Sequence, residues 1–185
     1  MKKYLALLLA LVMSLSLFAC GKKEGDDNKD KDKTEYKVAM ITDYGDITDQ
    51  SFNQTTYEAC KAFAEKNKIE FKYYKPAGDN TADRVAMIES AVEEGFNVIV
   101  MPGYAFGGAI VEAAPQHKDV KFIALDVAKG DLLEAGVAKA GEKYDFNPDN
   151  WELEKYVDMS NVYCAIYKEE LCGYMAGYAA VKLGY

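Results

Sequence analysis

The sequence predicts an α/β fold in which a parallel sheet is flanked by helices. From residue 36 onward, short apolar runs rich in Val, Ile and aromatic residues alternate with longer segments whose apolar residues recur at helical spacing. Glycine or proline stands at several boundaries between the two kinds of segment. This alternation predicts parallel strands that are joined by right-handed helical crossovers.

The first half of this region predicts three strands separated by two helices. KVAMIT at 37–42 has the composition of a buried strand, and polar residues that could cap a helix precede the helical pattern that ends near residue 66. Residues 69–75 form the second strand, before a Pro-Ala-Gly turn. Residues 81–94 form the second helix, which a glycine ends, and NVIVM at 97–101 is apolar enough to be buried on both faces.

The second half predicts two more strands and two more helices. A helix at 106–114 ends near a proline, and KFIALD at 121–126 forms the fourth strand. Residues 128–160 are expected to be an irregular, acidic excursion that contains the only tryptophan. NVYCAIY at 161–167 forms the fifth strand, and residues 169–183 form a last helix with several small residues.

The N-terminal segment has the features of an export signal. Two lysines precede an uncharged apolar run of about 15 residues, shorter than the roughly 20 that a membrane-spanning helix needs. The run ends at Leu17-Phe18-Ala19-Cys20, which resembles the lipobox of bacterial lipoproteins, although Phe18 is bulkier than usual. We therefore expect a signal peptide over 1–19 and a diacylated Cys20. A plain secretory signal with a chance cysteine is the alternative.

The residues after Cys20 have the composition of a flexible tether. Residues 20–35 are mostly charged and hold no large apolar side chain before the folded region begins. Such a stretch cannot bury enough surface to offset its ordering entropy. Two acyl chains hold a protein durably on a bilayer, so the expected location is the extracytoplasmic face of the cell membrane, through a lipid anchor.

Composition excludes some classes of function. The net charge of −8 argues against nucleic acid as a partner, because a phosphate backbone requires a basic face. With a single histidine and no CxxC, neither a metal site nor a cofactor is expected. Cys60, Cys164 and Cys172 are expected to be buried free thiols, and only the last two are close in sequence.

Candidate ligand-binding residues follow three of the predicted strands. Asp43, Asp49, Phe52, Asn53 and Gln54 follow the first strand, Tyr104 and Phe106 follow the third, and Asp126 ends the fourth. Ligands of open α/β sheets bind at the carboxyl ends of the strands near a topological switch point, so these loops are expected to share one edge, called the rim below. Carboxylates and amides can bind sugar hydroxyls and base N–H groups, and aromatic rings can stack on a planar base.

Each of these signals has a purely structural alternative. Asp49 and Ser51 could serve only as helix caps, and Phe52 could be a core contact at the start of its helix. The glycines of GYAFGG could serve a tight turn, since the segment lacks the GK[ST] ending of a P-loop. Asp126 is the hardest to explain by packing. The absence of Lys and Arg from the three loops argues against a phosphorylated ligand.

Four segments resemble the basic membrane protein (BMP) family of nucleoside-binding ABC-transporter lipoproteins. DYGDITDQSFNQTTYEA is similar to the family's signature after the first strand, in which Asp-x-Ser-Phe-Asn-Gln is the most specific element. GYAF at 103–106 and VKFIALD at 120–126 resemble the family's next two elements. Residues 168–178 resemble its later K-E-E-x-x-G-Y-x-A-G-Y helix. The resemblance covers nearly all of residues 36–185.

The resemblance implies a type I periplasmic-binding-protein-like fold that closes two lobes on a nucleoside, with a purine favoured. Residues 36–167 would be the first lobe and 168–185 the first helix of a truncated second lobe, with hinges near 126–128 and Tyr167. The protein would then be an N-terminal fragment that lacks the second lobe's ligand contacts. Residues 128–160 look longer than the usual family connection and could reshape the rim.

The resemblance also implies roles for individual residues and a partner. Phe52 would stack on the base, Asp43 and Asn53 would hydrogen-bond the ligand, and Asp126 would meet ribose hydroxyls. The protein would deliver its ligand to an ABC permease and would not be an enzyme.

Three other readings stay open. Paired carboxylates such as Asp43 and Asp126 could serve a nucleoside or glycoside hydrolase, if their pKa values were pushed apart. The same fold could serve a sensory or signalling lipoprotein. Within the transport reading, the ligand could be another small molecule such as riboflavin, because the polar rim suits several of them.

Overall fold

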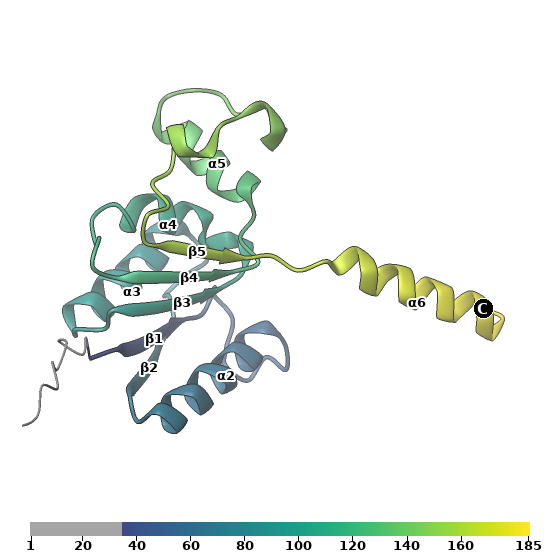
Figure 1. Ribbon diagram of the computed structural model, residues 1–185, viewed down its shortest axis with the longest axis horizontal. Coiled ribbons are helices and arrows are strands. Elements are labelled where there is room, and N and C mark those ends of the chain that lie inside the picture. Colours follow the sequence, from purple (N-terminus) through teal and green to yellow (C-terminus); the bar gives the residue numbers. More distant parts are fainter. Residues whose placement is uncertain (1–34) are drawn as a thin grey trace, which may run out of the picture. The chain divides into compact units, whose positions relative to one another are not determined.

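The computed structural model describes residues 35–185. The expected signal peptide and almost all of the expected tether lie outside the described residues. Figure 1 shows one five-stranded sheet with helices packed on it. Its strands are β1 (Lys37–Ile41), β2 (Glu70–Tyr74), β3 (Val98–Pro102), β4 (Lys121–Leu125) and β5 (Val162–Ala165). All neighbouring strands are parallel, in the order β2-β1-β3-β4-β5. The predicted parallel α/β fold is confirmed.

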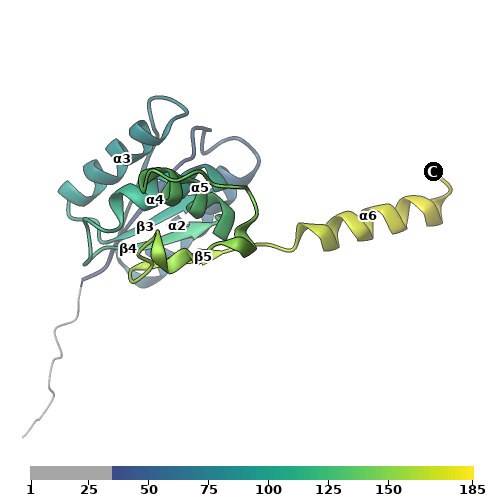
Figure 2. The same cartoon turned by 90° about the horizontal axis from the view of Figure 1, so that it is seen from above.

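Helices cover both faces of this sheet (Figures 1 and 2). The longer ones are α2 (Phe52–Asn67), α3 (Thr81–Glu93), α4 (Gly107–Ala113), α5 (Lys129–Lys139) and α6 (Glu169–Leu183). Three single turns of 3₁₀ helix are η1 (Tyr104–Phe106), η2 (Pro148–Asn150) and η3 (Leu153–Lys155). In the two views α2 lies on one face of the sheet, and α3, α4 and α5 lie on the other.

The main core lies between the sheet and the layer of α3, α4 and α5. Alternate strand residues point into it, because successive side chains of a strand face opposite sides of the sheet. Ile41, Ile99, Met101 and Phe122 are fully buried there against Ile88 of α3. Burying such side chains contributes about 1.5–3 kcal/mol each, which stabilises the strands whose ends carry the rim loops.

Residues 128–160 are more regular than the sequence predicted. They contain α5, which buries Leu132, Leu133 and Val137. The following segment packs on α5 at Gly136, where a Cβ atom would lie 2.9 Å from Cγ2 of Val157. The prediction missed this helix because its apolar stripe is short and interrupted by glycine.

The later part of the excursion connects α5 to the last strand of the sheet. Helix α5 starts after the rim end of β4, and the chain re-enters the sheet at the opposite end, at the start of β5. Tyr144, Trp151 and Tyr156 form an aromatic cluster on α5, with ring centroids 5.7 Å apart for the first pair and 5.5 Å for the second. The hydroxyl of Tyr144 lies 3.5 Å from the Cβ position of Gly130, at the start of α5. The segment after α5 thus reaches back to the start of that helix, which follows the rim end of β4, and the expectation that residues 128–160 reshape the rim stays a prediction.

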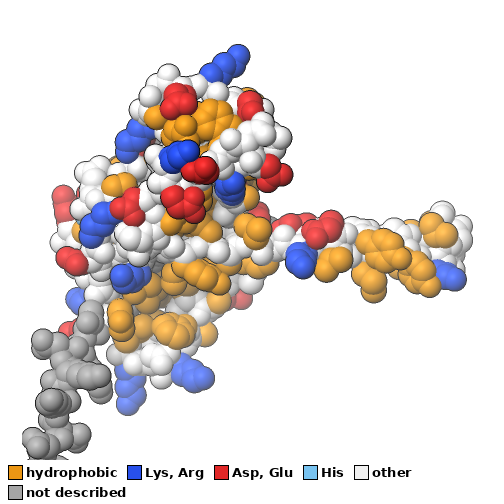
Figure 3. Space-filling model, turned by 45° about the horizontal axis from the view of Figure 1, so that its top comes forward, with side chains coloured by type: hydrophobic (Ala, Val, Ile, Leu, Met, Phe, Trp, Pro, Cys, Tyr) orange, Lys and Arg blue, Asp and Glu red, His pale blue; other side chains and the backbone are white. Residues whose placement is uncertain are grey.

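Helix α6 buries none of its residues. Its large apolar side chains are exposed, and Figure 3 shows them as hydrophobic surface along the helix. They are Leu171, Tyr174, Met175, Tyr178, Val181 and Leu183, each more than half exposed. No helix among the described residues is both long and apolar enough to cross a bilayer. Cys60, Cys164 and Cys172 are free thiols, as predicted, but the prediction that they are buried is wrong for Cys172, which is exposed, and the other two are only partly buried.

Candidate functional site

The rim has its topological switch point between β1 and β3. From β1 the chain crosses to β2 at one edge of the sheet, whereas from β3 it crosses to β4 and β5 at the other. The loops after β1 and β3 therefore meet, and a Cβ atom on Gly103 would lie 3.7 Å from Cβ of Asp43. Gly103 has φ +117°, a conformation that side chains rarely adopt, and this lets the second loop approach the first.

Asp43 is the central acceptor at this point. Its Oδ1 accepts hydrogen bonds from the N–H groups of Tyr44 (2.6 Å) and Gly45 (2.8 Å) and from Nδ2 of Asn53 (2.9 Å). Within residues 35–185 no group donates a hydrogen bond to its Oδ2, which lies 3.9 Å from the Cβ position of Gly103. One carboxylate oxygen is thus fixed by three donors, and the other remains available as an acceptor.

The surroundings of Asp43 keep it ionised. Burial opposes the charged form, but the N–H of Gly45, the amide of Asn53 and the N–H of Tyr44 stabilise it, and the charge of Arg84 adds to them. The pKa of Asp43 consequently lies below its usual value. An ionised carboxylate is the stronger acceptor for hydroxyl and N–H groups.

Asn53 joins the two carboxylates of the first loop. It is 4% exposed, and its Nδ2 donates to Oδ1 of Asp43 (2.9 Å) and to Oδ2 of Asp49 (2.9 Å). Its Oδ1 accepts the N–H of Asp43 at 3.3 Å. A Cβ atom on Gly45 would lie 2.6 Å from this amide, so the loop requires glycine there. In this structure Asn53 positions Asp43, and a direct contact with ligand stays a prediction.

Asp49 and Gln54 make the local bonds of a helix start. Asp49 accepts the N–H groups of Ser51 (2.8 Å), Gln54 (3.1 Å) and Asn53 (3.3 Å), as a cap of α2 does. Burial opposes ionisation of Asp49, but these donors and the Asn53 amide outweigh it, so its pKa lies below the usual value. Gln54 accepts the N–H of Gln50 (3.0 Å) and donates to Glu58 (2.9 Å). These bonds match the structural alternative for Asp49.

Phe52 lies at the rim with a partner that the sequence did not suggest. Its half-buried ring meets the ring of Tyr167 edge to face, with centroids 5.9 Å apart. Tyr167 follows β5 and is 48% exposed. The pair presents aromatic surface beside the acceptors of the first loop. The role of Phe52 as a stacking residue stays a prediction.

The two aromatic residues after β3 lie in different environments. Tyr104 is 69% exposed at the start of η1, whereas Phe106 is 0% exposed and belongs to the core. The structure differs here from the sequence prediction of a ligand-facing Phe106. The tight η1 turn points alternate side chains outward and inward, and the inward one is held beneath the guanidinium of Arg84.

Asp126 ends β4 in an unusual backbone conformation. Its φ is +61°, in the left-handed region that few non-glycine residues occupy, and its N–H donates to the carbonyl of Ala165 at 2.6 Å. Burial, and then the carboxylates of Glu169 and Asp131, raise its pKa. Backbone strain and neighbouring like charges are typical of functional sites, where they lower folding stability and are retained because ligand binding or catalysis requires them.

Arg84 also lies at the rim, although it was not among the predicted site residues. It lies on α3, is 4% exposed, and donates from Nε to the carbonyl of Asp43 at 2.9 Å. The prediction considered only residues within the loops, and this side chain reaches the rim from a helix. The sequence does contain one signal that points to this residue. Arg84 is the single arginine among 22 Lys and Arg residues, and a lone arginine suggests a position that requires a guanidinium.

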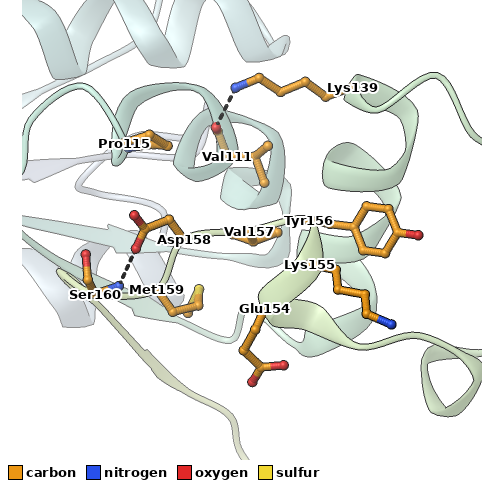
Figure 4. A pocket seen from close by; sticks show the side chains of 10 residues that line it. All are labelled: Val111, Pro115, Lys139, Glu154, Lys155, Tyr156, Val157, Asp158, Met159 and Ser160. Atoms are coloured by element: carbon orange, nitrogen blue, oxygen red, sulfur yellow. Dashed lines mark hydrogen bonds between the residues drawn. The ribbon is translucent and has the colours of Figure 1, made fainter.

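A hollow of about 620 Å³ lies at the other end of the sheet (Figure 4). It is lined by the end of α4, the end of α5 and residues 154–160. The polar groups that Figure 4 joins are already paired: Lys139 donates to the carbonyl of Val111 (3.0 Å), and Asp158 accepts the N–H of Ser160 (2.9 Å). We therefore place the candidate site at the rim, where an acceptor is unengaged.

The rim of this parallel α/β unit therefore gathers acceptor oxygens and an aromatic pair near the switch point of the sheet. The chain belongs to the Bmp family, since the family model described as "ABC transporter substrate-binding protein PnrA-like" matches residues 36–184. The family resemblance predicted from the sequence is confirmed.

Individual relatives are similar over part of their length. The chain is 34% identical over 132 residues to the "CD4+ T-cell-stimulating antigen" of Listeria innocua serovar 6a, covering 66% of this chain and 36% of that protein. It is 23% identical over 178 residues to the "ABC transporter nucleoside-binding protein BmpA" of Lactococcus lactis subsp. cremoris, covering 94% of this chain and 42% of that protein. The chain thus spans less than half the length of these relatives.

Among solved structures, the chain is similar to the 5-methylthioribose transporter solute-binding protein from Thermotoga lettingae in complex with 5-methylthioribose. The match has a TM-score of 0.49 and 16% identity, and covers 80% of this chain and 37% of that one.

Proposed function

We propose that this chain forms the first-lobe wall of a nucleoside site, with a purine nucleoside favoured, in a protein that delivers its ligand to an ABC permease. The observation that carries the proposal is the carboxylate of Asp43, whose Oδ1 is fixed by three donors while its Oδ2 is free of donors within residues 35–185. An acceptor of this kind suits a base N–H or a ribose hydroxyl.

Three further observations support a nucleoside. The half-buried ring of Phe52, backed by Tyr167, offers a stacking surface beside Asp43, and base–aromatic stacking contributes about 1–3 kcal/mol. Asp126 lies two strands away from Asp43, a separation of about 10 Å, which suits contacts to base and sugar at once. The printed name of the Lactococcus relative describes nucleoside binding. Because the chain spans under half of that relative, we expect its own affinity to be weak.

The proposal can be tested by titrating the ¹⁵N-labelled chain with inosine, guanosine and adenosine at millimolar concentration. We expect the amide signals of Asp43, Gly45 and Asp126 to shift, and Asp43→Asn to abolish the shifts. Asp46→Asn is the matched control, because Asp46 lies in the same loop, is exposed and pairs with Lys75. Unchanged spectra with all three nucleosides would count against a nucleoside, and a parallel flavin titration would reveal the main alternative ligand.

The same experiment tests how the sugar is bound. If Asp126 meets ribose hydroxyls, a 2′,3′-dideoxynucleoside binds more weakly than the ribonucleoside to the natural chain. In Asp126→Asn the preference for the ribonucleoside shrinks, because a neutral amide is the weaker acceptor. Release of free base during the titration would instead favour a hydrolase.

A further inference from the structure

Arg84 has three partners, and each comes from a different loop of the rim. Its Nε donates to the carbonyl of Asp43 at 2.9 Å, and its Nη2 pairs with the carboxylate of Asp79. Its guanidinium carbon lies 5.8 Å from the ring centroid of Phe106. Asp43 follows β1, Asp79 follows β2, and Phe106 follows β3. One buried side chain therefore joins the ends of three neighbouring strands.

These contacts require arginine rather than lysine. A guanidinium is a rigid fork that can donate in two directions and lie flat on a ring, whereas an ammonium is a point charge on a flexible stem. Everywhere else in the sequence the basic residues are lysines. The one arginine stands at the position where a fork is needed and where the side chain is 4% exposed.

We propose that Arg84 is a positioning residue of the ligand site, holding the backbone of Asp43 so that Oδ2 of its carboxylate is presented beside Gly103. The inference rests on the proposed role of Asp43 as a ligand acceptor. Arg84 itself does not touch the ligand, because its side chain is buried and its fork faces Asp43 and Asp79.

Arg84 also acts on Asp43 through its charge. The guanidinium favours the ionised carboxylate, together with the donors from Gly45, Asn53 and Tyr44 and against the effect of burial. The nearby carboxylate of Asp49 shares the amide of Asn53 with Asp43. Removing the guanidinium removes the cation that favours ionised Asp43, so its pKa should rise. A role in packing alone would leave that pKa unchanged.

The test uses the chain with Arg84→Gln and Arg84→Lys, and with Lys118→Gln as the control that removes a cation from a distant ion pair. In the ligand-free chain, ¹³C NMR follows the titration of the Asp43 carboxyl. We expect its midpoint to rise in Arg84→Gln and to stay near the natural value in Arg84→Lys and in the control. Guanosine binding, measured by NMR titration, should weaken about 10- to 100-fold in both Arg84 variants, as expected when a charged hydrogen bond is misaligned.

The two readouts separate the two claims. If the natural chain binds no nucleoside, the proposed function fails, while the ligand-free titration still tests Arg84. An unchanged Asp43 midpoint in a folded Arg84→Gln chain would overturn the inference, as would unchanged guanosine affinity in that variant.

If both Arg84 variants fail to fold, Asp79→Asn decides. This substitution keeps Arg84 but weakens the ion pair between its Nη2 and residue 79. Asp79 is exposed, so the substitution should leave the core intact. A smaller loss of guanosine affinity in Asp79→Asn, with the fold intact by ¹⁵N spectra, supports the inference, and no loss overturns it.

Discussion

At the scale of single residues, the rim depends on one amide that holds two carboxylates together. Asn53 is buried and donates to both Asp43 and Asp49, so two like charges can lie in one loop. The sequence motif contains these three residues but does not show which role each of them has. In the structure Asp49 caps the helix, Asn53 bridges, and Asp43 keeps an oxygen unengaged.

Replacing the amide by a third carboxylate should be strongly unfavourable. In Asn53→Asp we expect the free energy of unfolding at pH 7 to fall by about 2–4 kcal/mol, because a buried charge then faces two like charges. The loss should shrink as the pH falls, since the crowded carboxyl has a raised pKa and protonates first. Urea unfolding at pH 7 and pH 5 measures this.

Asn67→Asp, at the exposed end of the same helix, is the control for this substitution. We expect it to change the free energy of unfolding by under about 1 kcal/mol. Equal effects of the two substitutions would contradict the bridging role of Asn53.

Asp126 should show opposite effects on stability and binding. Its pKa is raised by burial and by Glu169 and Asp131, so the folded state binds its proton more tightly than the unfolded state does. Ionised Asp126 therefore destabilises the fold near neutral pH. This penalty begins to shrink as the pH falls through the raised pKa and is gone below the pKa of the unfolded chain. Asparagine carries no charge and tolerates the left-handed backbone better than most residues.

We expect Asp126→Asn to raise Tm by about 1–3 °C at pH 7 and to have little effect at pH 3, while ligand binding weakens. Thermal unfolding followed by circular dichroism measures the first effect. Asp119→Asn, at an exposed aspartate, should leave Tm unchanged at both pH values. A lower Tm for Asp126→Asn at pH 7 would show that the carboxylate stabilises the fold instead.

At the scale of elements, α3 and α6 have similar lengths and different support. Helix α3 buries Arg84, Ile88 and Ala91 against the sheet, whereas α6 buries none of its residues. Isolated helices of about 15 residues are marginal in water, so most helical stability comes from tertiary packing. The two helices therefore differ in how their backbone hydrogen bonds are protected.

Hydrogen–deuterium exchange of this chain should separate the two helices clearly. Amides of α6 should exchange at least about 100-fold faster than those in the middle of α3, because local opening of α6 exposes no buried surface. Mass spectrometry of peptides from each helix measures the rates. Protection of α6 equal to that of α3 would mean that its apolar side chains are covered in solution.

At the scale of the whole molecule, the proposed receptor needs an anchor as well as a site. The expected lipid attachment at Cys20 lies outside the described residues, so we propose it from the sequence alone. A tether of charged residues between lipid and rim would keep the site near a permease while leaving it free to bind solute.

Cys20→Ser should release the protein from the membrane when the gene is expressed in a bacterium that processes lipoproteins. Two acyl chains hold a protein durably, and without them only the signal segment can retain it. Labelling with radioactive palmitate and fractionation of membranes measure this. Cys172→Ser is the control, since that exposed thiol lies far from the expected signal in the sequence. Equal labelling of the natural chain and Cys20→Ser would argue against the lipobox.

The sequence alone predicted the strand–helix order, the parallel sheet and the family, and it brought Asp43, Phe52 and Asp126 to one rim. Those features follow from local patterns, because the periodicity of apolar residues and the residues after each strand are written along the chain. Helix α5 was not predicted, because its row of apolar residues is short. The helix is stabilised by burial of Leu132 and Leu133 against the rest of the fold.

Only the tertiary structure decided which side chains face outward and which oxygens are free. Phe106 and Tyr104 are two positions apart, yet one is fully buried and the other exposed, because packing under Arg84 selects between them. Asp43 and Asp49 are the same residue type in one loop, yet their hydrogen-bond partners give them different roles. Such choices depend on groups brought together from distant strands, and no local pattern in a sequence records them.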